Sequence, residues 1–119
     1  MSELRIVKMG DILDMSGEVQ DFAAASDLMI ELRYDGHRAG LIGFIPRTDG
    51  AYLWMHKEPL ALEHYISFGL LAKRIVNCYL PKYGTIFGHS DTKSGKWLRF
   101  LGAEVKPISD TIVEFTIRG

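Results

Sequence analysis

The sequence predicts an α/β (α+β) domain built on a mixed, mostly antiparallel central sheet. Three patterns lead to this class. Short β-rich segments separated by turn signals occupy residues 27–56, a long helical pattern covers 59–80, and another short strand pattern covers 85–89. A strand, a helix and a second strand in that order form a right-handed unit, so we expect the fourth and fifth strands to be parallel. The predicted order is β-α-β-β-β-α-β-α-β-β, in a single domain over residues 1–119.

The N-terminal segment predicts one strand and one helix. Apolar and charged side chains alternate over residues 3–9, which is typical of a half-buried strand. Residues 11–25 place apolar side chains at helical spacing. Asp11 is expected to be the N-cap of that helix, because its carboxylate can accept from free backbone N–H groups.

The next segment predicts three strands in a meander, over residues 27–34, 38–46 and 51–56. The dipeptide Asp35-Gly36 between the first two is a strong hairpin signal, because both residues tolerate positive φ. The strands that it joins are therefore expected to be antiparallel neighbours.

A long helix is predicted over residues 59–80. Pro59 suits its first turn, where a missing N–H costs nothing, and Pro81 and Gly84 are expected to end it. Its apolar arc is so wide that we expect deep packing on the sheet, with Cys78 as a small core residue.

The C-terminal third predicts a buried strand over 85–89, a helix over 92–101 and a pair of strands over 103–108 and 111–117. Gly102 stands where a helix C-cap is expected. The inward residues of the helix are expected to be Trp97, Leu98 and Leu101, and the outward ones Lys93, Lys96 and Arg99.

Composition excludes several function classes. Fourteen Lys and Arg against fifteen Asp and Glu give a net charge of −1, which does not favour nucleic acid or an anionic membrane surface. A single cysteine excludes an intramolecular disulfide and suits a reducing compartment. Charged residues interrupt the most apolar window, so no membrane span is expected. We expect a soluble protein of the cytoplasm.

Two histidines are candidate catalytic residues. His56 and His89 lie at the C-terminal ends of the two predicted parallel strands, where open α/β sheets place their ligand crevice. Histidine is the most frequent acid or base near neutral pH. The histidines show no metal-ligand spacing, so no metal site is expected. Gly95-Lys96 does not complete a phosphate loop, because Gly88 is too far away and Trp97 follows the lysine.

A resemblance to a known family rests on residues 91–103, which read Asp-Thr-Lys-Ser-Gly-Lys-Trp-Leu-Arg-Phe-Leu-Gly-Ala. In its small residue, helix length and Leu-Gly ending, this run resembles the corresponding motif of the GNAT superfamily of N-acetyltransferases. The narrower likeness is carried by residues 80–84 (Leu-Pro-Lys-Tyr-Gly) and 97–103, which look like the acetyltransferase-like proteins of tailed bacteriophages. Some of those are internal virion proteins.

The resemblance implies an acetyl-CoA-dependent N-acetyltransferase. Its cofactor would lie between splayed fourth and fifth strands. His56 or His89 would serve as the base, and the acceptor would be a small-molecule or protein amine. The cofactor-binding residues that the resemblance implies are Trp54, Met55 and His56 on the fourth strand, Lys57 toward the pyrophosphate, and Asp91 and Ser94 on the opposite side.

Two departures from the family pattern leave alternatives open. The junction at 56–62 lacks the glycines that hold the cofactor pyrophosphate, and Leu98 stands where the family commonly has a proton-donating tyrosine. The second reading is therefore a non-catalytic phage virion protein, or one that binds a host protein, on an acetyltransferase fold. It would place the chain in the virion or in the host cytoplasm. A third reading is an unrelated α/β ligand-binding domain. A homodimer through the terminal strands is also open.

Overall fold

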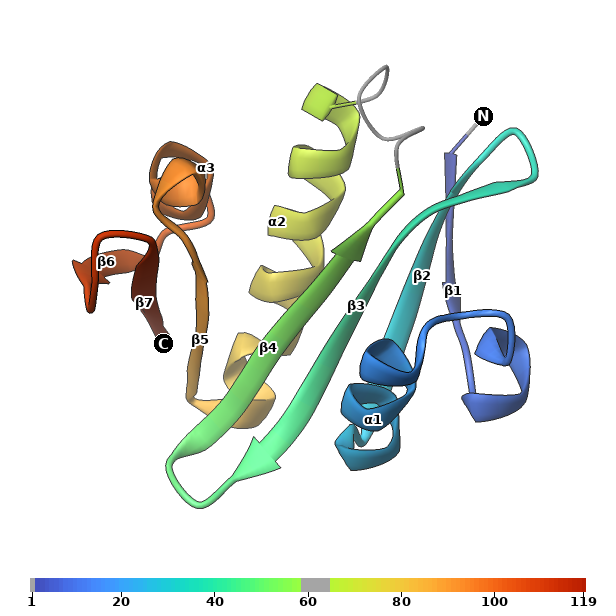
Figure 1. Cartoon of the computed structure of the whole chain (residues 1–119), viewed down its shortest axis with the longest axis horizontal. Helices are drawn as coiled ribbons and strands as arrows, with labels where there is room; N and C mark the ends of the chain where they lie inside the picture. The colour runs from blue at the N-terminus through green and yellow to red at the C-terminus, as the bar shows by residue number, and fades with distance from the viewer. Residues whose placement is uncertain (1, 59–64) are drawn as a thin grey trace.

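The computed structural model describes residues 2–58 and 65–119, which form one seven-stranded sheet with helices on both faces (Figure 1). The strand order is β1-β2-β3-β4-β5-β7-β6, and only the β4–β5 pair is parallel. The predicted fold class, with its parallel fourth and fifth strands, is confirmed. Because β4 and β5 are neighbours, the strand arrangement that would support an unrelated domain is absent.

The elements follow the predicted order with shifted boundaries. In chain order they are β1 (Ser2–Ile6), the 3₁₀ helix η1 (Met9–Ile12), α1 (Gly17–Ala25), β2 (Leu28–Tyr34), β3 (His37–Arg47), β4 (Gly50–Lys57), α2 (Tyr65–Tyr83), β5 (Thr85–Asp91), the 3₁₀ helix η3 (Thr92–Ser94), α3 (Gly95–Phe100), β6 (Glu104–Pro107) and β7 (Ile112–Arg118).

The single helix predicted over 11–25 is wrong, since a break separates η1 from α1. Ser16 caps α1 instead of Asp11, and its Oγ accepts from the backbone N–H of Val19 at 3.4 Å. The Asp11 carboxylate accepts from the Lys8 backbone N–H at 2.8 Å, so it stabilises η1. The break leaves Leu13 70% exposed, although helical spacing had placed it on the buried side.

The predicted meander is confirmed. Strands β2, β3 and β4 are consecutive antiparallel neighbours. Both residues of the hairpin turn have positive φ, 51° at Asp35 and 81° at Gly36, as the dipeptide predicted.

Helix α2 extends beyond its predicted end at Leu80 and contains Pro81 in its last turn. A proline there removes only one backbone donor, and the Gly84 N–H closes the helix by donating to the Leu80 carbonyl at 2.7 Å. Leu70 and Cys78 are exposed, so the packing of α2 is shallower than predicted. The predicted helix start at Pro59 lies outside the described residues.

The sheet carries one core on each face. Helices α2 and α3 pack on one face, over a core that includes Phe44, Phe68 and Phe115. Helix α1 packs on the other face, over Leu41, Ile45 and Trp54. The predicted orientation of α3 is confirmed, with Trp97, Leu98 and Leu101 buried and Lys93, Lys96 and Arg99 exposed. No helix among the described residues is long and apolar enough to cross a membrane.

Candidate functional site

Strands β4 and β5 run side by side for only a short distance before they part. Their ladder contains two pairs, Ala51 with Ile86 and Tyr52 with Phe87. Figure 1 shows β4 leaning away from β5 beyond this point, toward α2 and β3. The sheet is therefore split into a β1–β4 half and a β5–β7 half.

The register of β3 and β4 shows which backbone groups of β4 face this split. The Glu58 N–H donates to the Ala39 carbonyl at 2.9 Å, and residues of an antiparallel pair alternate in the side to which they bond. Trp54 and His56 therefore bond toward β3, opposite Gly43 and Leu41. The backbone N–H and C=O of Met55 point toward β5, beyond the last pair of the β4–β5 ladder.

Gly88 lies in β5 immediately after the last ladder pair. A side chain at this position would meet the Phe115 ring at 2.6 Å and the Leu53 carbonyl oxygen at 2.7 Å. Glycine therefore lets β5 lie against β4 and β7 here, so that the strands part just beyond this point.

A cleft of about 200 Å³ opens where the strands part. We call it the strand cleft. Its walls come from both halves of the sheet and from α1 and α3. The residues that line it are Phe22, Tyr52, Leu53, Trp54, Met55, Lys57, His89, Ser90, Ser94, Trp97 and Phe115.

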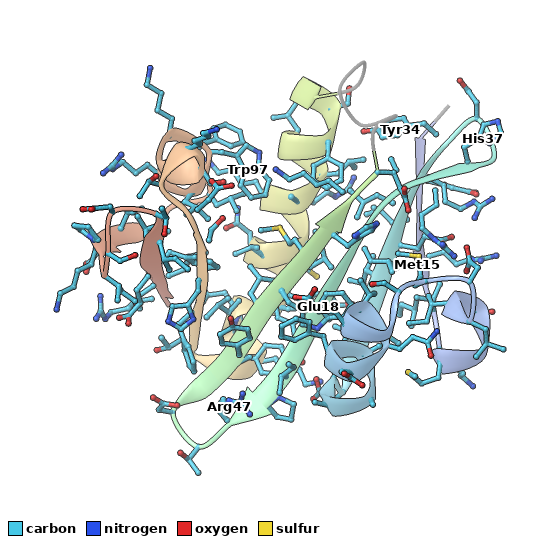
Figure 2. The ribbon with its side chains drawn as sticks, viewed as in Figure 1. Met15, Glu18, Tyr34, His37, Arg47 and Trp97 are labelled. Carbon is cyan, nitrogen blue, oxygen red and sulfur yellow. The ribbon has the colours of Figure 1, made fainter. Side chains whose placement is uncertain are left out.

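Lys57 is the cation that lines the strand cleft. Its Nζ lies 4.3 Å from the centre of the Trp97 ring, which gives a cation–π contact. Burial lowers the pKa of Lys57 below its ordinary value, and the charge of Asp91 partly offsets this effect. Figure 2 shows Trp97 between α3 and α2, on the side of α3 that faces the split.

The Trp54 ring is fixed on the α1 face of β4. It lies against Gly43 of β3, where a Cβ atom would overlap the ring. Its Nε1–H donates to Ser26 Oγ at 2.7 Å, and the Phe22 ring stacks on it with centroids 5.8 Å apart. Three independent contacts therefore set the orientation of this ring.

A second cavity, of about 200 Å³, lies between the start of α1 and the α1 face of β4. We call it the helix pocket. It shares Phe22, Trp54 and Met55 with the strand cleft, so the two cavities are neighbours with common walls. The residues that line it are Ser16, Glu18, Val19, Phe22, Trp54, Met55 and His56.

The structure places the two candidate catalytic histidines in different cavities. His56 lines the helix pocket, and its Nε2 lies 3.0 Å from Glu58 Oε1. His89 lines the strand cleft, and its Nδ1 lies 3.3 Å from Tyr52 Oη. The side chain of Glu114 approaches the other nitrogen of His89 at 4.0 Å.

The predicted cofactor residues divide in the same way. Trp54, Met55, Lys57 and Ser94 line the strand cleft, whereas His56 lines the helix pocket. Asp91 lines neither cavity. Its carboxylate accepts from the backbone N–H of Ser94 at 3.0 Å and from Ser94 Oγ at 2.9 Å, so it positions Ser94 at the start of η3.

Sequence reasoning did not single out Tyr52, Phe22, Ser16 or Glu18 as site residues. One pattern in the sequence does point to Tyr52. Side chains alternate along a strand, so Tyr52 lies on the same face as Trp54 and His56. Nothing local in the sequence indicated that α1 would cover that face. Within the described residues, no group of three or more His, Cys, Asp or Glu side chains could hold a metal ion.

Comparisons with known proteins place this architecture among acetyltransferase folds. No protein-family model and no curated protein matches the chain. Solved structures do match, and the similarity covers nearly the whole chain.

A ribosomal-protein N-acetyltransferase from Escherichia coli superposes with a TM-score of 0.73 at 14% identity, over 99% of this chain and 94% of that one. An IAA acetyltransferase from Bacillus cereus gives 0.70 at 7% identity, over 100% of both chains. An acetyltransferase described as a putative member of the GNAT family, from Desulfovibrio desulfuricans, gives 0.67 at 12% identity, over 99% of both. At these identities the likeness shows the fold, which is that of the GNAT acetyltransferases.

Proposed function

We propose that this protein is an N-acetyltransferase that takes its acetyl group from acetyl-CoA. The observation that carries the proposal is the parting of β4 from β5 after two ladder pairs, with a cleft at that point. Four of the six cofactor residues implied by the sequence resemblance line this cleft. The three solved structures described above are all named as acetyltransferases.

The residues of the strand cleft fit the narrow thioester arm of such a cofactor. The backbone N–H and C=O of Met55 face the cleft and can bond to an amide-bearing chain laid along β4. Lys57 supplies a positive charge at the end of β4 that leads toward α2, where an anionic phosphate group would be held. When bound, the cofactor supplies an acetyl group activated as a thioester.

The residues on the α1 side fit the handling of an acceptor amine. A protonated amine is not a nucleophile, so a base must take its proton before it attacks. His56 lines the helix pocket, and the contact of its Nε2 with Glu58 Oε1 at 3.0 Å orients the imidazole. The rings of Trp54 and Phe22 form a rigid wall between the two cavities, which positions the two reactants.

Binding of acetyl-CoA tests the proposal. We expect a saturable signal in isothermal titration calorimetry and a rise in melting temperature, because a ligand that binds only the folded state stabilises it. Replacing Lys57 with Ala should weaken binding about tenfold, since a charge-assisted contact contributes about 1.5 kcal/mol. Lys93→Ala is the matched control, because Lys93 is exposed and does not line the cleft. If the wild-type protein shows neither heat nor stabilisation, the proposal is wrong.

One observation favours a second candidate function. Leu98, at the position where the resemblance leads us to expect a tyrosine, is fully buried and carries no proton donor. A non-catalytic role would explain the leucine at this position. The protein would then keep the fold and bind a phage or host protein. Virion and phage assignments rest on the sequence resemblance alone. Acetyl-CoA binding without transfer to any amine would favour this second function.

A further inference from the structure

We propose that β1 pairs with β1 of a second copy of this chain, antiparallel and with Leu4 on the two-fold axis, so that two sheets join into one. The interaction surface is separate from the candidate functional site. Strand β1 lies at one end of the strand order and β6 at the other (Figure 1). The strand cleft lies between β4 and β5, so pairing through β1 leaves it open.

The backbone of β1 presents a row of hydrogen-bonding groups to the outer edge of the sheet. The Val7 N–H donates to the Met29 carbonyl of β2 at 3.1 Å, and residues of an antiparallel pair alternate in the side to which they bond. The N–H and C=O groups of Ser2, Leu4 and Ile6 therefore point away from β2. Within the described residues no strand pairs with this edge, which makes it a template for a further strand.

The opposite edge of the sheet is blunted. Strand β6 has four residues, and the Ile108 N–H that follows it donates to the Ile112 carbonyl at 2.9 Å. By the same alternation, Val105 and Pro107 face the outer edge of β6, where proline offers no N–H. Strand β1 has five residues and no proline. Strand addition is therefore favoured at β1 and not at β6.

The charges of β1 select a second copy as the partner and set the register. A two-fold interface requires a surface that is complementary to itself. With Leu4 opposite Leu4 of the second copy, Glu3 of each chain faces Arg5 of the other. The backbone also matches, because Ser2 then faces Ile6 and both point outward. Moving the axis to Glu3 or to Arg5 keeps the backbone match but opposes two like charges, which destabilises a strand pair.

Both charged side chains are accessible, although each has a partner in its own chain. Arg5 lies 3.3 Å from Glu31, and Glu3 lies 3.5 Å from Arg33. The side chains of Arg5 and Glu3 are nevertheless 54% and 62% exposed, respectively. In the proposed register they form a non-hydrogen-bonded pair, the kind in which opposite side chains lie closest. They can therefore meet across the interface and extend the Glu31 network into the second copy.

The other face of β1 supplies apolar contacts. Leu4 pairs with Leu32, which belongs to the core beneath α2, so Leu4 and Ile6 lie on the α2 side. They are 39% and 65% exposed and line a groove of about 170 Å³ between β1 and α2. Directly opposed residues share a face of a sheet, so a second copy brings its own Leu4 and Ile6 to this side. Pairing would remove these apolar surfaces from water.

Sedimentation velocity of the purified full chain measures the association. We expect a monomer–dimer equilibrium in the micromolar range, because a short strand pair makes a small interface. Leu4→Pro should abolish the dimer and keep the fold, since it removes a donor that only the second copy uses. Val105→Pro is the matched control on the other edge and should leave the dimer intact. A wild-type monomer at every concentration, or a dimer that Leu4→Pro leaves unchanged, would overturn the inference.

Charge reversal tests the partner and the register. Glu3→Arg and Arg5→Glu each oppose like charges across the axis, so each variant alone should dimerise about tenfold more weakly. Mixed in equal amounts, the two variants should form a heterodimer, because every positive position then faces a negative one. Glu104→Arg reverses an exposed charge on β6 and should dimerise as the wild type does. Failure of the mixed variants to associate more tightly than either alone would contradict the register.

A salt titration keeps this test decisive if Arg5→Glu does not fold beside the buried Glu31. Salt screens exposed charges, so it should strengthen the Glu3→Arg dimer and weaken the wild-type dimer. The same direction of change in both proteins would contradict the proposed pairing of Glu3 with Arg5.

NMR of a mixed sample of isotope-labelled and unlabelled protein reads the register directly. Contacts between the α-protons of Glu3 and Arg5 of different chains are expected, because the backbones of a non-hydrogen-bonded pair lie closest. Contacts between two Glu3 residues, or with β6, would overturn it. Acetyl-CoA is titrated separately. A dimer that does not bind acetyl-CoA contradicts only the proposed function, and a monomer that binds it contradicts only this inference.

Discussion

At the residue scale, two glycines shape the candidate site. Gly43 leaves a flat backbone on which the Trp54 ring lies, and Gly88 lets β5 approach Leu53 and Phe115 at the point where the strands part. Neither glycine has a positive φ, so neither is required by backbone conformation. Glycine is needed at both positions because a side chain there would overlap residues that line the strand cleft.

Gly43→Ala tests this reading. The added methyl group overlaps the Trp54 ring, so the ring must rotate away, breaking its hydrogen bond to Ser26 and its stacking on Phe22. We expect a loss of about 2 kcal/mol in the free energy of unfolding, typical of an overpacked core. The near-ultraviolet circular dichroism of the indole should change with it, and urea denaturation measures the loss.

Gly17→Ala provides the control for Gly43→Ala. An added methyl group at Gly17 meets no atom within 4 Å, and the position lies in the first turn of α1. Alanine should therefore stabilise the protein by a few tenths of a kcal/mol, up to about 1 kcal/mol, through its higher helix propensity. If both substitutions cost the same, the loss at Gly43 does not arise from the Trp54 contact.

At the element scale, one buried carboxylate ties the N-terminal segment to the sheet. Glu31 of β2 is fully buried and is paired with Arg5 of β1 at 3.3 Å, with Arg33 at 2.8 Å and with Arg38 of β3 at 2.8 Å. Arg38 also reaches Asp14, in the break before α1, at 3.0 Å. The network therefore fixes the segment from which α1 departs toward the helix pocket.

The pH dependence of stability should reveal this network. Burial raises the pKa of Glu31, but hydrogen bonds from Arg33 and Arg38 outweigh it, so the pKa lies below the ordinary 4.5. A lowered native pKa gives stability that is fully present above pH 4.5 and is lost as pH falls through the native value. Unfolding followed from pH 7 to pH 3 should show this loss.

Glu31→Gln should remove that acid-dependent component and lower stability at pH 7 by about 3 kcal/mol, because buried arginine charges lose their partner. Glu104→Gln is the control. It removes an exposed pair with Arg118, so its cost should be below about 1 kcal/mol. A Glu31 variant with the wild-type pH profile would show that other carboxylates carry the acid sensitivity.

Elements with strong local signals were predictable from sequence, and elements set by competing local signals were not. The Asp35-Gly36 turn specified a hairpin, because two positive φ angles admit few alternatives. Apolar spacing predicts helix from residue 11, but Asp11 belongs to η1, and Ser16 caps α1, which begins only at Gly17. The helix pocket was not predictable, because Glu18 and His56 line one cavity only through the packing of α1 on β4.

At the scale of the whole molecule, the sheet consists of two halves that share few strand contacts. The β1–β4 half and the β5–β7 half meet through two ladder pairs and through the core that α2 and α3 complete. Ligands that fill the strand cleft therefore contact both halves at once. Binding should stiffen the junction between them more than either half alone.

Amide hydrogen exchange, resolved by NMR, measures this coupling at adjacent residues of β4. The Trp54 N–H bonds to β3 inside the continuous half-sheet, so it should exchange slowly with or without ligand. The Met55 N–H faces the strand cleft beyond the β4–β5 ladder and should exchange at least tenfold faster in the free protein. Acetyl-CoA should slow Met55 selectively, because the cofactor arm becomes its hydrogen-bond partner. Equal protection of the two amides before ligand addition would mean that the split in the sheet is closed in solution. A fast Met55 amide that acetyl-CoA leaves unchanged would show an open cleft that takes a different ligand.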